Sequence, residues 1–211
     1  MRYWIEARGD HLYAALAGRE TAAEMREFAL AVHAACRSHD CSRILVSVRA
    51  SRPVFKPEEY GISGYASALV GPACQIALLG DSVELNAAHE YIEVCARQQK
   101  MNVRAFRNEL AALRWLRAAA GQPEPRKYRF ARTVVQGAPD EPGVYALWEG
   151  DELVYYGRAP RLREALLARL ASHPAATHYG WELCADPARR EAELLRAFER
   201  EHGRMPRDNA A

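Results

Sequence analysis

The run Arg43-Ile44-Leu45-Val46-Ser47-Val48-Arg49 is the densest β-branched and aliphatic stretch of the chain. Such side chains fit a pleated, buried strand, so the run predicts a strand in the core of a sheet. The run Cys74-Gln75-Ile76-Ala77-Leu78-Leu79-Gly80 has the same character and predicts a second buried strand. These two runs favour a sheet covered by other elements.

Toward the N-terminus, two short runs at 3–8 and 11–16 are separated by Gly9-Asp10. Adjacent Gly and Asp are typical of a hairpin turn, so a pair of antiparallel strands is expected. Thr21 with Glu24 three residues later forms a capping-box pattern, which predicts a helix running to about His39.

Toward the C-terminus of the same region, the pattern alternates between helix and strand. Pro57 marks the start of one helix, and Ser82 caps another that runs to about Lys100. A strand at 102–107 and a helix from Glu109 to Ala120 follow. The order β-β-α-β-α-β-α-β-α predicts an α/β fold with a mainly parallel or mixed sheet covered by helices.

The run Gly121-Gln122-Pro123-Glu124-Pro125-Arg126-Lys127 is proline-rich and polar, which predicts a linker at 120–136 between a first domain at 1–119 and a second at 137–211. The second domain has the order ββαβα. Its predicted elements are strands at 144–148 and 153–156, a helix at 161–173, a strand at 179–184, and a helix from Pro187 to about Gly203.

The composition excludes several classes of protein. Charged residues make up 27% of the chain and the net charge is only +2, so a nucleic-acid or membrane surface would have to be a local patch. No run approaches about 18 apolar residues, and the N-terminus lacks an apolar signal core, so no membrane association is expected. Five cysteines fit a reducing compartment, and we expect a cytoplasmic protein.

Four short motifs occur in order in the second domain. They are Gly143-Val144-Tyr145, Tyr155-Tyr156-Gly157, Glu191-Ala192-Glu193-Leu194-Leu195 and Pro206-Arg207-Asp208-Asn209. Together, over about 70 residues, they resemble the GIY, YIG, Glu-x-x-Leu-Ile and Pro-x-x-Asn motifs of the GIY-YIG nucleases. The resemblance implies a metal-dependent DNA endonuclease that hydrolyses phosphodiesters.

The resemblance also implies roles for individual residues. Tyr145 and Tyr155 would face the phosphate and the attacking water, and a tyrosine can act as base when cations lower its pKa. Glu191 would hold Mg²⁺ or Mn²⁺ through its carboxylate oxygens. Asn209 would brace the site, and Gly143 and Gly157 would be structural.

One position departs from this pattern. The family's catalytic arginine lies eight residues after the glycine of YIG, and Ala165 occupies that position here. Arg161 and Arg169 lie four residues to either side, on the same helical face, so either could supply the guanidinium. Arg158 and Arg163 add local positive charge suited to contacts with a DNA backbone.

The first domain resembles the STAS domains of anti-sigma-factor antagonists. The strand–helix order and Gly18 before a Thr-capped helix carry this likeness. It implies a regulatory or partner-binding role. Ser51 is nearest to the serine that accepts phosphate in such switches, but Arg49-Ala50 replace the usual preceding aspartate.

Other interpretations stay open. The second domain could be a catalytically degenerate module that binds nucleic acid or protein, or an adaptor without a nucleic-acid role. The tyrosines could be strand aromatics in a small core, and Glu191 a solvated helix residue.

Two further clusters are ambiguous. His33, Cys36, His39 and Cys41 could suggest a metal site, although packing at a helix end explains them as well. The basic aromatic run at 126–132 could contact nucleic acid or pack as a linker on the second domain.

Overall fold

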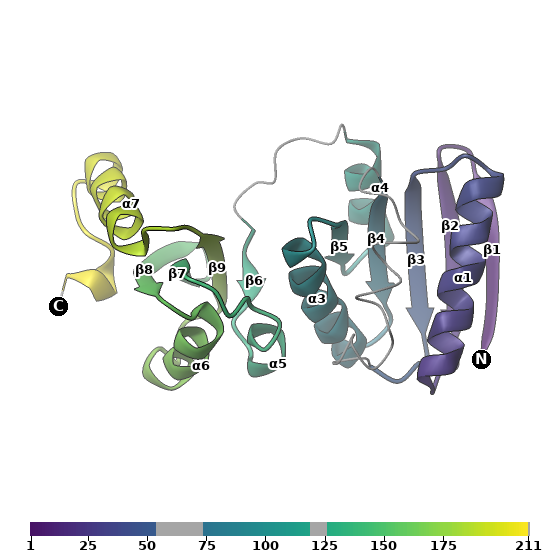
Figure 1. The fold of residues 1–211 in the computed structure, drawn as a ribbon, viewed down its shortest axis with the longest axis horizontal. Coiled ribbons are helices and arrows are strands. Elements are labelled where there is room, and N and C mark those ends of the chain that lie inside the picture. The colour runs from purple at the N-terminus through teal and green to yellow at the C-terminus, as the bar shows by residue number, and fades with distance from the viewer. Residues whose placement is uncertain (54–73, 119–125, 211) are drawn as a thin grey trace. The chain divides into compact units, whose positions relative to one another are not determined.

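The structure, a computed structural model, describes residues 1–53, 74–118 and 126–210. The chain is of the α/β class and divides into two compact units, Met1–Gly121 and Gln122–Ala211 (Figure 1). The helix expected to start at Pro57 lies outside the described residues.

The first unit is a mixed five-stranded sheet in the order β1-β2-β3-β4-β5. The strands β1 and β2 pair antiparallel, and the remaining pairs are parallel. The two runs that predicted buried strands form neighbouring β3 and β4. The strand bounds are β1 Arg2–Arg8, β2 His11–Ala17, β3 Arg43–Arg49, β4 Gln75–Gly80 and β5 Asn102–Phe106.

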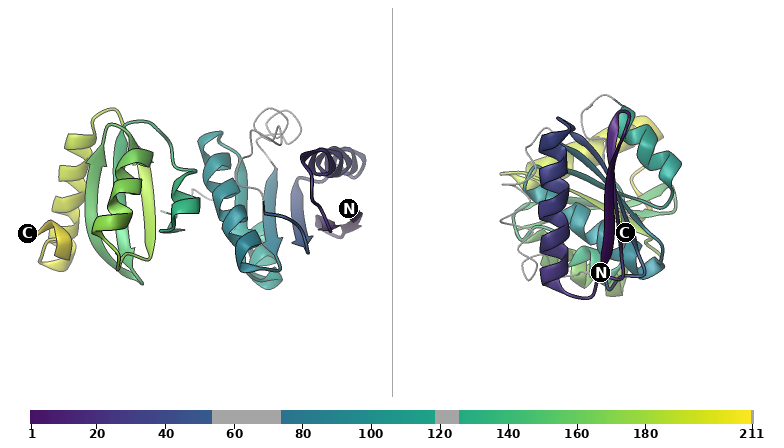
Figure 2. Two further views of the ribbon diagram at one scale, coloured as in Figure 1. Left: turned by 90° about the horizontal axis from the view of Figure 1, so that it is seen from below. Right: turned by 90° about the vertical axis from the view of Figure 1, so that its right-hand side faces the viewer.

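Helices cover both faces of this sheet, as Figure 2 shows end-on. One face packs against α1 (Ala22–Ser38) and α3 (Val83–Gln98) around Phe28 and Leu85. The other face packs Leu45 and Tyr13 against α4 (Glu109–Arg117). Burial on both faces explains why β3 reads as a continuous apolar run.

The local signals of the first unit are confirmed. Gly9 turns between β1 and β2 with a φ of 62°, in the left-handed region that glycine adopts readily. The Thr21 hydroxyl accepts from the backbone N–H of Glu24, whose carboxylate accepts in return from the N–H of Thr21. Ser82 caps α3 in the same manner through the N–H of Leu85.

The second unit is a four-stranded antiparallel sheet in the order β6-β9-β7-β8. Its elements are β6 Tyr128–Arg129, α5 Arg132–Val135, β7 Gly143–Glu149, β8 Glu152–Ala159, α6 Leu162–Ser172, β9 His178–Leu183, α7 Pro187–His202 and a 3-10 turn at Arg207–Asn209.

This unit begins earlier than the predicted boundary at residue 137. Tyr128 pairs with Tyr179 and adds a short strand to the sheet, so part of the predicted linker is folded. Tyr128 is 3% exposed and packs on the ring of Tyr179, which is a core contact. The basic aromatic run therefore lies partly against this unit's own sheet.

The helices α6 and α7 cover opposite faces of the sheet (Figures 1 and 2). Tyr145 lies directly opposite Gly157 in the register, so their side-chain positions share the α6 face. Successive strand residues point to opposite faces, so Tyr156 and Arg158 point toward α7. The ring of Tyr156 accordingly packs edge-on against Phe198 of α7.

Candidate functional site

The two motif tyrosines lie side by side on the α6 face of the sheet. Tyr145 comes from β7 and Tyr155 from β8, and their ring centroids are 5.9 Å apart. Gly157 makes room for both, because a Cβ there would lie 2.5 Å from Cζ of Tyr145 and 2.7 Å from Cε1 of Tyr155. The hairpin thus brings the two phenols together, as the motif spacing predicts.

Arg169 joins the two phenols. Its Nε donates to the Tyr145 hydroxyl at 3.0 Å, and its Nη2 donates to the Tyr155 hydroxyl at 2.6 Å. The guanidinium also lies over the ring of Tyr155, with Cζ 4.5 Å from the centroid. We call Tyr145, Tyr155 and Arg169 the phenol–guanidinium cluster.

Arg161 does not reach this cluster. It occupies the N-cap position of α6, where the backbone is extended rather than helical. Its guanidinium pairs with Asp140 at 2.8 Å and with Glu164 at 3.2 Å. Of the two arginines flanking Ala165, the structure therefore brings only Arg169 to the tyrosines.

The ionisation of Tyr145 is set mainly by burial. The residue is only 3% exposed, and this desolvation raises the pKa of its phenol. The hydrogen bond from Arg169 acts in the opposite direction but does not offset it. Tyr145 is therefore protonated at neutral pH, contrary to the lowered pKa that a tyrosine base requires.

Glu191 lies away from the phenols. It begins the second turn of α7 and pairs with Arg158, whose Nε is 3.4 Å from Oε2. The side chain of Arg158 points from β8 toward α7, whereas the phenol–guanidinium cluster lies on the face of the sheet that α6 covers. The predicted metal ligand and the predicted tyrosines are thus separated by the sheet.

The donor set around Glu191 does not suit a metal shared with the cluster. Mg²⁺ and Mn²⁺ sites use one or two carboxylates with phosphate oxygens and water, and a guanidinium beside the carboxylate opposes a second cation there. Within residues 1–53, 74–118 and 126–210, no three His, Cys, Asp or Glu side chains group as metal ligands.

Asn209 braces the edge strand β8. Its Oδ1 accepts from the Tyr156 N–H and its Nδ2 donates to the Tyr156 carbonyl, both at 2.8 Å. The side-chain amide thereby substitutes for a neighbouring strand on the free edge. The predicted bracing role is consistent with these contacts.

The remaining predicted residues have structural contacts. Arg163 donates to the carbonyl of Ala138 at 2.8 Å. A Cβ on Gly143 would overlap the Glu182 carbonyl oxygen and lie 2.8 Å from Leu162, so this glycine allows β7, β9 and the start of α6 to approach.

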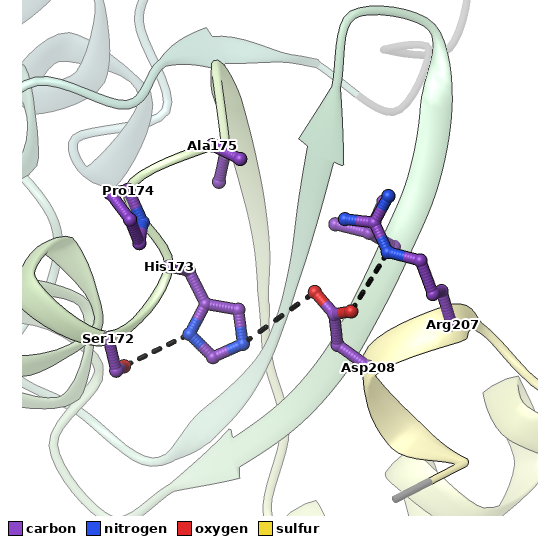
Figure 3. Close-up of a pocket in the computed structure, with 8 residues that line it drawn as sticks. Ser172, His173, Pro174, Ala175, Arg207 and Asp208 are labelled. Carbon is purple, nitrogen blue, oxygen red and sulfur yellow. Dashed lines mark hydrogen bonds and ion pairs between the residues drawn. The ribbon is translucent and has the colours of Figure 1, made fainter.

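Sequence reasoning missed a pocket beside the cluster. His173 follows α6 and its ring centroid lies 5.1 Å from that of Tyr155. A cavity of about 280 Å³ opens beside it, and Figure 3 shows its polar side chains. Its lining residues are Val154, Ser172, His173, Pro174, Ala175, Ala176, Arg207 and Asp208. One signal was present: His173 lies four residues after Arg169, on the same helical face.

The ambiguous clusters of the first unit have local partners. The Cys41 thiol donates to the Arg43 carbonyl at 3.3 Å, and burial raises the pKa of Cys36 to about 11. Ser51 donates to the Arg49 carbonyl and accepts from the Arg19 N–H, at the carboxyl end of β3.

Comparison with known proteins gives no family for this chain. No family model matches it, and no curated protein is similar to it. Among the helices of the described ranges, none is both long and apolar enough to cross a bilayer.

Proposed function

We propose that the second unit binds nucleic acid and holds a backbone phosphate at the phenol–guanidinium cluster. The observation that carries this proposal is the pair of hydrogen bonds from Arg169 to Tyr145 and Tyr155. A phosphate oxygen needs positive charge and N–H or O–H donors, and planar guanidinium is well suited to both.

The cluster keeps donors in reserve for an anion. Tyr155 accepts a hydrogen bond from Arg169, so its hydroxyl proton stays available to donate to an anion, whereas the buried Tyr145 hydroxyl is also hydrogen-bonded to Tyr155. The guanidinium uses only its Nε and one Nη2 hydrogen, so further N–H groups stay available as well.

The three residues have different roles in this proposal. Tyr145 is almost fully buried, so its role is to hold the Arg169 guanidinium in place through their hydrogen bond. Tyr155 and Arg169 are half-buried, and these two contact the phosphate. Arg169 lies one helical turn beyond Ala165, so it supplies the charge that the resemblance to GIY-YIG nucleases expects from that position.

The proposed organisation of the whole chain follows the two resemblances. The ββαβα order and the paired tyrosines support a GIY-YIG-like second unit. The mixed sheet with helices on both faces supports a STAS-like first unit that regulates the second or binds a protein partner. We place the protein in the cytoplasm on the strength of its five reduced cysteines.

Binding is tested by fluorescence anisotropy of a labelled DNA strand at several salt concentrations. We expect Arg169→Gln to weaken binding about tenfold and to reduce the salt dependence by about one phosphate contact. Arg161→Gln is the matched control, because Arg161 caps the start of the same helix and its guanidinium pairs with Asp140 instead of the phenols. Equal losses in both variants would refute a specific phosphate site at Arg169.

Metal-dependent cleavage of DNA is the second candidate function. It is favoured by the guanidinium that Arg169 brings to the two tyrosines, whereas Glu191 pairs with Arg158 on the opposite face of the sheet. Plasmid nicking with Mg²⁺ or Mn²⁺ decides between the candidates. The binding proposal expects no nicking, whereas nicking by the wild type that disappears in Glu191→Gln establishes the nuclease.

A further inference from the structure

The cavity beside the cluster, lined by His173 and Asp208, has no role in phosphate binding as proposed above. It holds about 280 Å³, just below the ~300 Å³ at which pockets for drug-sized ligands begin. This volume suits one small ring system, and a base pair would not enter it.

The charges of the cavity do not favour a second phosphate. Among the residues that the structure describes, Arg207 is the one guanidinium that lines it, and that group is paired with Asp208 at 3.0 Å and with Glu149 at 2.8 Å. An anion would therefore meet the Asp208 carboxylate and a guanidinium that two carboxylates already neutralise. A neutral ligand with hydrogen-bonding edges fits this surrounding better.

The cavity is lined by apolar side chains and by a carboxylate oxygen that can accept a hydrogen bond. Val154, Pro174 and Ala175 supply the apolar part of the lining, to which His173 also belongs. Asp208 Oδ2 lies 4.0 Å from His173 Nε2, too far for a hydrogen bond, so this oxygen can accept an N–H from a ligand (Figure 3).

The cavity is connected to the cluster by a ring contact. The His173 ring, which lines the cavity, lies 5.1 Å from the ring of Tyr155, which belongs to the cluster. The guanidinium of Arg169 lies over the same Tyr155 ring, so the proposed phosphate position and the cavity adjoin one shared side chain.

We propose that this cavity receives one unpaired nucleobase that carries an amino group, next to the phosphate bound at Arg169. The inference rests on the proposed function, and it narrows the ligand to single-stranded or locally unpaired DNA. The base stacks near His173 and donates its amino N–H to Asp208. A base inside a duplex is unavailable to such a pocket unless it leaves the stack.

The test compares single-stranded DNA, duplex DNA and a strand of abasic sites by fluorescence anisotropy. The variant Ala175→Phe fills the cavity, and Ala171→Phe on the exposed side of α6 is its matched control. Base stacking is worth ~1–3 kcal/mol, so we expect Ala175→Phe to weaken single-strand binding about tenfold and to leave abasic binding unchanged.

A second variant covers the case in which Ala175→Phe does not fold, as judged by circular dichroism. Wild type should bind oligo(dC) more tightly than oligo(dT), because cytosine has an amino group where thymine has a carbonyl. Asp208→Ala, which leaves no side-chain acceptor, should abolish that preference. Persistence of the preference in Asp208→Ala would overturn the base pocket.

The results separate the two proposals. If Arg169→Gln loses binding while Ala175→Phe binds single strands like wild type, the base pocket is wrong and the phosphate site stands. If Arg169→Gln binds like wild type, the phosphate site is wrong and the base pocket is overturned with it.

Discussion

The Nη2 of Arg169 donates a 2.6 Å hydrogen bond to the hydroxyl of Tyr155, and this bond joins α6 to the edge strand β8. Arg169 lies one turn after Ala165, the position at which the GIY-YIG motif pattern, which this sequence resembles, would have an arginine. Residues four apart share a helical face, and the long arginine side chain covers the remaining distance. The guanidinium therefore reaches the tyrosines from a different position in the sequence.

The first prediction concerns the ionisation of Tyr145. Burial raises the pKa of its phenol, and Arg169 partly opposes that rise. Arg169→Gln should therefore raise the pKa of Tyr145 further. The pKa of Tyr156, which is raised by burial on the other face, should stay where it is. The measurement is a pH titration of ¹³Cζ-labelled tyrosine by NMR, and a lowered Tyr145 pKa in the variant would disprove the coupling.

The second prediction concerns the brace on β8. Asn209→Ala removes two hydrogen bonds to the Tyr156 backbone, so the free energy of unfolding of the second unit should fall by about 2 kcal/mol. Arg204→Gln removes an exposed ion pair with Glu152 in the same segment and should cost at most ~1 kcal/mol. Urea unfolding measures both, and equal effects would show that Asn209 does not brace the strand.

The third prediction concerns the space at Gly157. Gly157→Ala places a methyl group against the ring of Tyr145, which is too buried to move freely. We expect a loss of about 1–3 kcal/mol in stability and weaker DNA binding, because the phenols are forced apart. Gly150→Asn is the control, since that glycine turns with a φ of 60° in open space and Asn tolerates this conformation. Unchanged binding by a folded Gly157→Ala would contradict the expected geometry.

The fourth prediction concerns the pH dependence of the first unit. Burial, and then repulsion from Arg19, lower the pKa of His89 to about 4 from about 6.5 in an unfolded chain. Between these values only the unfolded chain binds the proton. Stability contributed by neutral His89 is therefore present above pH 6.5 and is lost as the pH falls toward 4.

The size of this loss is about 3 kcal/mol. His89→Leu removes the titrating group, so the variant should lose less stability over the same pH range. Chemical unfolding of the full chain between pH 7 and pH 4 gives the slope for each protein. Identical slopes would show that His89 does not titrate as its burial requires.

The sequence predicted the elements well where local chemistry determines them. Thr21 and Glu24 specify a helix start through their own hydrogen bonds, and the β-branched run at 43–49 specifies a buried strand. The proximity of Tyr145 and Tyr155 follows from a hairpin whose strands are adjacent in sequence. Each of these inferences needs only short-range information.

The features that the sequence could not specify depend on tertiary packing. Motif order cannot specify which face of the sheet α7 covers, and this face decides that Glu191 meets Arg158 instead of the phenols. The choice between Arg161 and Arg169 depends on where α6 begins, because an N-cap residue does not follow helical spacing. The cavity at Asp208 forms only when the C-terminal turn packs beside His173.

The most direct test of the phosphate site follows the NMR signals of labelled tyrosine and arginine during titration with a short DNA strand. We predict the largest shifts at Tyr155 and Arg169, smaller shifts at Tyr145, and loss of all three when neutral methylphosphonate linkages replace the phosphodiesters. Shifts confined to residues outside the phenol–guanidinium cluster, or shifts that persist with the neutral backbone, would contradict it.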